Sequence, residues 1–83
     1  MSGVPRVTLF TRDGCCLCEE AKRVLDSARR RAGFELDIVD IDTDPELQQS
    51  YNDEVPVIAI NGAKAFKYRV SEAEFLKKLA ARA

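Results

Sequence analysis

The residues best suited to chemistry are three cysteines, Cys15, Cys16 and Cys18, which are the only cysteines in the chain. The chain has no histidine, so a Cys-His ion pair cannot activate a thiol. Residues three apart on a helix share a face, with Cβ atoms roughly 5–6 Å apart, whereas adjacent residues diverge. Cys15 and Cys18 can therefore form a disulfide. We assign Cys15 as the nucleophile, Cys18 as the resolving thiol and Cys16 as an auxiliary thiol.

The elements around the cysteines are predicted to place them at the start of a helix. A β-prone run at residues 7–11 stops at a turn signal, Asp13-Gly14. From Leu17 onward the apolar residues recur on one helical face, and a basic run before Gly33 indicates the helix end. A helix N-terminus lowers the pKa of a thiol from about 8.5, because it presents free N–H groups and positive charge. We expect this position to favour a Cys15 thiolate, with Arg12 as an auxiliary cation.

The remaining residues alternate between strand and helix patterns. Apolar residues of both parities at 34–41 predict a strand covered on both faces, central or nearly central in a sheet. Three further signals predict a short helix, a hairpin and a last helix, at Asp44-Pro45, Asn61-Gly62 and the capping box Ser71 to Glu74. The order is βαβαββα. With a right-handed crossover it predicts an α/β fold whose four-stranded mixed sheet is flanked by three helices.

Length, composition and charge limit the classes of protein to consider. A chain of 83 residues with 46% hydrophobic residues fits a single domain, residues 1–83. Clustered cysteines cannot join distant segments as they do in secreted disulfide scaffolds. The amino terminus lacks the apolar region of a signal peptide, and no apolar run is long enough to span a membrane. We therefore expect a cytoplasmic protein, and a monomer. A net charge of -1 gives no long-range attraction to polyanions, so we expect no nucleic-acid or membrane partner.

Together these residues resemble the small glutaredoxin-like proteins of the thioredoxin fold. The resemblance spans about residues 6–78 and is carried by residues 15–18, by 39–47, by Tyr51 and by Val55-Pro56-Val57. It implies an oxidoreductase in which Cys15 attacks a protein or small-molecule disulfide and Cys18 resolves the mixed disulfide.

The resemblance also implies a substrate-binding segment, which comprises Glu54, Val55 and Pro56. It implies that the Val55-Pro56 bond is cis and lies against the Cys15 sulfur. The backbone of Val55 is then free to pair with an extended substrate. The electron donor is left open between glutathione and a thioredoxin reductase-type system.

Departures from familiar glutaredoxins predict poor use of glutathione. Cys16-Leu17 replaces their Pro-Tyr, and Glu54 stands where they usually have Thr. Residues 68–72 replace the Gly-Gly-x-Asp segment that holds glutathione in the family. Acidic side chains near both places should repel the two carboxylates of glutathione; they are Asp53, Glu54, Glu72 and Glu74. We therefore expect no resident cofactor, and glutathione at most as a poor reductant.

Two other classes of function stay open. A zinc or iron-sulfur protein can carry cysteines at this spacing, but here its other ligands would have to come from a second subunit or from glutathione. We assign no metal ligands in this chain. A non-catalytic thioredoxin-like binding module would instead carry three ordinary thiols. Thiol reactivity separates the module from an enzyme, and colour or bound metal in purified protein identifies a carrier.

Overall fold

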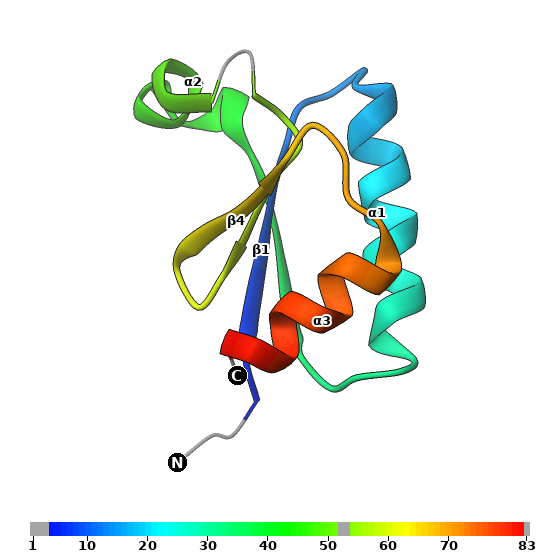
Figure 1. Ribbon diagram of the computed structural model, residues 1–83. Coiled ribbons are helices and arrows are strands. Elements are labelled where there is room, and N and C mark those ends of the chain that lie inside the picture. The colour runs from blue at the N-terminus through cyan, green and yellow to red at the C-terminus, as the bar shows by residue number, and fades with distance from the viewer. Residues whose placement is uncertain (1–3, 52–53, 83) are drawn as a thin grey trace.

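The computed structural model describes residues 4–51 and 54–82. Its elements are β1 (Arg6–Thr11), α1 (Cys16–Arg29), β2 (Glu35–Asp40), the 3-10 turn η1 (Ile41–Thr43), α2 (Pro45–Tyr51), β3 (Val57–Ile60), β4 (Ala63–Lys67) and α3 (Glu72–Arg82). The order confirms the predicted βαβαββα sequence (Figure 1). Within the described ranges, no helix has the length and apolar character needed to cross a bilayer.

The four strands form one mixed sheet in the order β2-β1-β3-β4. β1 runs parallel to β2, as strands joined by a helical crossover do, and β3 runs antiparallel to both β1 and β4. In the parallel pair, Thr11 lies opposite Asp40. The carboxyl ends of β1 and β2 therefore lie side by side, and the segments that follow them meet at one end of the sheet.

The prediction of a central position for the second strand was wrong. β2 lies at an edge of the sheet, whereas β1 and β3 are central. All four residues of β3 are buried, but Ile38 of β2 is 46% exposed. The apolar pattern misled us because it shows that a residue can be buried, not that a neighbouring strand and helix cover it.

The hydrophobic core lies between the sheet and two helices, α1 and α3, which lie on the same side of it (Figure 1). α1 buries Cys18, Ala21, Leu25 and Ala28, while two other apolar residues of the helix, Leu17 and Val24, are only half-buried. α3 contributes Phe75, whose ring lies 5.3 Å from that of Phe34 at an edge-to-face angle. This packing fixes α1, and with it the cysteines, against β1.

The turns and helix caps that local sequence signals predict are present in the structure. Asn61 and Gly62 have φ angles of 52° and 86° between β3 and β4, as a tight hairpin turn requires. The N–H of Glu74 donates to Ser71 Oγ at 3.2 Å, which confirms the capping box of α3. The N–H of Glu46 donates to Asp44 Oδ1 at 2.9 Å and begins α2. Each of these signals depends only on neighbours within one turn.

Candidate active site

Cys15 is the N-cap residue of α1 and has an extended backbone, with φ −91° and ψ 111°. A turn holds it close to the end of β1, because the N–H of Cys15 donates to the carbonyl of Arg12 at 3.3 Å. Gly14 within this turn has φ +78°, a conformation that strongly favours glycine. The predicted turn at Asp13-Gly14 therefore carries the chain from β1 to the N-terminus of α1 and leaves Cys15 there.

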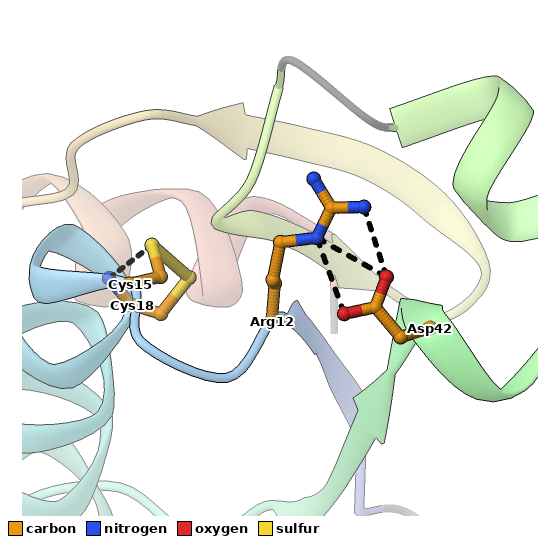
Figure 2. Close-up of a disulfide and its surroundings, with 4 residues drawn as sticks. All are labelled: Arg12, Cys15, Cys18 and Asp42. Atoms are coloured by element: carbon orange, nitrogen blue, oxygen red, sulfur yellow. Dashed lines mark hydrogen bonds and ion pairs between the residues drawn. A yellow bond between two sulfur atoms is a disulfide. The ribbon is translucent and has the colours of Figure 1, made fainter.

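Cys15 and Cys18 form a disulfide, with their Cα atoms 5.2 Å apart. The N–H of Cys18 also donates to Cys15 Sγ at 3.1 Å (Figure 2). The three thiols differ in access to solvent: Cys15 is half-buried, Cys18 is 1% exposed and Cys16 is exposed and free. The roles of nucleophile, resolving thiol and auxiliary thiol stay predictions.

The surface beside Cys15 is hollowed. A depression of about 290 Å³ is lined by Gly14, Cys15, Cys16 and Glu19. A cleft of about 260 Å³ lies on the neighbouring surface, where its lining includes Arg12, Lys22 and the exposed Ile38. Within the part of the chain that the structure describes, no group of three or more cysteine or acidic side chains is arranged to hold a metal ion.

The side chain of Arg12 forms a two-pronged contact with the carboxylate of Asp42. Arg12 Nη2 lies 2.9 Å from Asp42 Oδ1, and Nε lies 3.2 Å from both carboxylate oxygens. Hydrogen bonds from Arg12, and then from Gln48, hold the pKa of Asp42 below its ordinary value. Figure 2 shows the guanidinium turned toward Asp42 and away from the disulfide. A role for Arg12 at the Cys15 thiol stays a prediction.

Sequence reasoning missed Asp42 as a partner of this site. Two neighbouring aspartates have local roles: Asp40 accepts from the N–H of Asp42, and Asp44 caps α2. Asp42 differs because it lies two residues beyond β2, next to the residue that follows β1. The parallel pairing of β1 with β2 was the available signal, since it places Arg12 and Asp42 at adjacent strand ends.

The Val55-Pro56 bond is cis, as the resemblance implied. Pro56 is buried, and its carbonyl accepts from the N–H of Tyr68 at 2.9 Å. No backbone hydrogen bond joins Val55 to another residue in the ranges 4–51 and 54–82. The proximity of Pro56 to the Cys15 sulfur, and the substrate-binding role of the segment, stay predictions. Asp53, one of the acids expected to repel glutathione, lies outside the described residues.

Glu54 is paired with Lys64 of β4, whose Nζ lies 2.8 Å from Glu54 Oε1. This hydrogen bond lowers the pKa of Glu54 and raises the pKa of Lys64. Lys64 Nζ also lies 5.3 Å from the centre of the Tyr51 ring, which packs at a tilt against Phe10 of β1 with the ring centres 4.8 Å apart. Lys64 therefore already has an anionic partner and an aromatic one.

Comparison with known proteins identifies relatives of this chain. Residues 6–80 match the family described as glutaredoxin-like domain (DUF836). A glutaredoxin-like protein of Dictyostelium discoideum is 32% identical over 72 residues, which cover 80% of this chain and 67% of that protein. An uncharacterized protein of Mycobacterium tuberculosis is 29% identical over 73 residues, covering 82% of this chain and 75% of that protein.

Solved structures agree with the observed architecture. A protein from Nitrosomonas europaea aligns with a TM-score of 0.81 at 27% identity, covering 95% of each chain. A structural-genomics target from X. campestris aligns with a TM-score of 0.78 at 29% identity, covering 90% of this chain and 96% of that one. A thioredoxin mutant from Halobacterium salinarum, 16% identical, has a TM-score of 0.72 over 93% of this chain and 73% of its own, which shows the thioredoxin fold alone. The chain belongs to the glutaredoxin-like domain family.

Proposed function

We propose that the protein is a thiol-disulfide oxidoreductase that uses Cys15 and Cys18 as a dithiol couple. The observation that carries this proposal is the position of the pair: a half-buried sulfur at the N-cap of α1 joined to a 1% exposed sulfur one turn later. Only the first of these sulfurs can meet a disulfide from another molecule. The second can meet only its partner within the same turn.

The proposed reaction has two exchange steps that transfer two electrons. In the first, the Cys15 thiolate attacks one sulfur of the substrate disulfide, that bond breaks, and the departing sulfur leaves as a thiolate that takes a proton from water. In the second, the Cys18 thiol loses its proton and attacks the Cys15 sulfur of the mixed disulfide. The second substrate thiol leaves, the protein keeps the Cys15–Cys18 disulfide, and the substrate has been reduced to a dithiol.

The hydrogen bond at Cys15 supports its assignment as nucleophile. The N–H of Cys18 points at Cys15 Sγ from 3.1 Å, and α1 continues for 14 residues behind it. A hydrogen bond to the charged form of a group favours that form, and the N-terminus of a helix adds positive charge. Both effects stabilise a thiolate at position 15. Cys16 is exposed, but it lies within the helix and faces away from Cys18.

The substrate we favour is a protein or peptide disulfide whose extended backbone pairs with Val55. Glutathione fits less well, because Glu54 lies directly before Val55 and because Glu72 and Glu74 occupy the first turn of α3. Lys64, a nearby cation able to bind a glutathione carboxylate, is already bonded to Glu54. The reductant that returns the protein disulfide to the dithiol form is unidentified, and redox cycling with a thioredoxin reductase-type system is the first pairing to assay.

The test uses three single variants of the reduced protein mixed with a peptide disulfide. Cys15→Ser should abolish reduction, Cys18→Ala should accumulate a mixed disulfide at Cys15, and Cys16→Ser should react at the wild-type rate. Mass spectrometry of the trapped species identifies the cysteine that attacked. An inactive Cys16→Ser variant, or a peptide trapped on Cys16, would contradict the assignment. Three unreactive thiols would favour a binding module, and iron or zinc bound to freshly purified protein would favour a carrier.

The selectivity against glutathione has its own experiment. The Cys15-glutathione adduct of Cys18→Ala is formed, and the rate at which free glutathione resolves it is compared with turnover of the peptide adduct. Glu54→Thr should speed the glutathione reaction, since it removes one acid and frees Lys64. Glu35→Thr is the matched control, because Glu35 also pairs with a cation, Arg6 at 3.8 Å, but at the amino end of β2, the other end of the sheet from the segment before β3. Equal acceleration by both substitutions would refute the local explanation.

A further inference from the structure

One ion pair joins the cysteine turn to the neighbouring strand end. Arg12 follows β1 directly and begins the turn that ends at Cys15, whereas Asp42 lies in η1 directly after β2. Their two-pronged contact, which we call the Arg12–Asp42 clamp, is made by side chains that are 32% and 38% exposed. It is therefore open to solvent and can be altered without disturbing the core.

The carboxylate of Asp42 is itself held in place by its surroundings. Gln48 Nε2 of α2 donates to Asp42 Oδ1 at 2.9 Å, and the N–H of Asp42 donates to Asp40 Oδ1 at 2.9 Å. The first of these bonds orients the carboxylate from α2, and the second fixes the backbone that carries it. On the other side of the clamp, the carbonyl of Arg12 accepts from the N–H of Cys15, so the cation and the reactive sulfur share one turn.

We propose that Asp42 is a positioning residue that sets the redox potential of the Cys15–Cys18 couple by holding the Arg12 guanidinium away from the Cys15 sulfur. The proposal rests on the thiol-disulfide exchange proposed above. Figure 2 shows the arrangement: the Arg12 side chain lies between the disulfide and Asp42, and its charged end is bound to the carboxylate.

The direction of the effect follows from the charges of the two redox states. The reduced couple carries a thiolate at Cys15, which a nearby guanidinium stabilises, whereas the disulfide is uncharged and gains nothing. The other charges in the neighbouring sequence are unchanged whether the Arg12–Asp42 clamp is intact or broken; they belong to Asp13, Glu19 and Lys22. A guanidinium close to the Cys15 sulfur therefore favours the reduced form and raises the potential. Asp42 opposes this, and so keeps the dithiol a stronger reductant.

The experiment measures the equilibrium of the Cys15–Cys18 couple in dithiothreitol redox buffers at pH 7. Asp42→Asn keeps the shape of the side chain and removes its charge. We expect the equilibrium to move about threefold to tenfold toward the reduced protein, which corresponds to a rise of about 15–30 mV for a two-electron couple. Alkylation of Cys15 by iodoacetamide in the Cys16→Ser background should speed up by a similar factor. Arg12→Gln should leave both readouts close to the wild-type values, because the guanidinium that it removes is already held away from the sulfur.

Asp37→Asn is the matched control for a change in net charge. Asp37 accepts a hydrogen bond from Arg6 Nη1 at 2.9 Å, so it forms the same kind of arginine pair between the same two strands. This pair lies nearer the amino ends of the strands, away from the cysteines. The control variant should keep the wild-type potential.

The double variant Arg12→Gln/Asp42→Asn shows whether the effect passes through Arg12. If it does, adding Asp42→Asn to Arg12→Gln changes the potential much less than it does in the wild type. A shift of equal size in both backgrounds would overturn the proposal, since Asp42 would then act through its own charge. A potential in Asp42→Asn equal to those of the wild type and Asp37→Asn would also overturn it. A wild-type couple that does not cycle at all would instead refute the proposed function.

Discussion

The burial of Cys18 predicts that replacing it by serine destabilises the protein. Cys18 is 1% exposed and lies on the face of α1 that also buries Ala21 and Leu25. None of the buried side chains in the described residues is polar or charged. Serine nearly matches cysteine in size, so the substitution mainly exchanges a weakly polar thiol for a hydroxyl that must leave water.

The size of the effect follows from the loss of hydration at that hydroxyl. Burying a hydroxyl without a full partner costs about 1–3 kcal/mol in proteins. For a domain of this size each kcal/mol lowers Tm by about 4–8 °C. Cys16→Ser, at an exposed position, should change stability by less than about 0.5 kcal/mol.

The assay is urea unfolding of the reduced wild type, Cys16→Ser and Cys18→Ser under one reducing buffer. Using the reduced wild type as reference keeps the stability of the disulfide out of the comparison. If Cys18→Ser loses no more stability than Cys16→Ser, then Cys18 is not buried in solution. The argument that only Cys15 can reach a substrate would then fail, and the order of attack would have to be reassigned.

Three further predictions concern the surroundings of the site. In reduced protein, iodoacetamide should label Cys15 and Cys16 well before Cys18; peptide mapping that finds Cys18 labelled first would contradict this order. The pKa of Glu54 should lie below its ordinary 4.5, so its bond to Lys64 stabilises the fold above that pH and is lost as the pH falls through the lowered value. Carboxyl NMR titration checks this, and Lys64→Met should return the midpoint toward 4.5. Ser71→Ala should lower the free energy of unfolding by about 0.5–2 kcal/mol through loss of the α3 cap, with Ser50→Ala, an exposed serine of α2, as the control.

Much of the fold could be predicted because its signals are local. The turn before Cys15, the hairpin at Asn61-Gly62 and the capping box at Ser71 each involve residues a few positions apart. Their backbone preferences act wherever the segment lies in the sheet. The spacing of Cys15 and Cys18 belongs to the same class, since one helical turn brings the two sulfurs together.

Contacts between distant segments were decided by the tertiary structure. The exposed edge position of β2 depends on which strands pair, and a run of apolar residues does not contain that information. Glu54 and Lys64 are ten positions apart, and they meet in a hairpin that folds β4 back along β3, where Lys64 lies opposite Ala59. The cis form of Val55-Pro56 was expected from family resemblance, because local sequence leaves any X-Pro bond mostly trans.

The cysteine pair and the Arg12–Asp42 clamp proposed to set its redox potential thus have different origins in this chain. The amino-acid sequence by itself determined that two thiols share a helix start, because that requires only a turn signal, a helical pattern and a spacing of three. Only the parallel register of β1 with β2, in which Thr11 lies opposite Asp40, brought Arg12 to Asp42 across 30 positions of sequence. A charge acts over a few ångströms of space, and the distance along the chain between these two residues says nothing about that space.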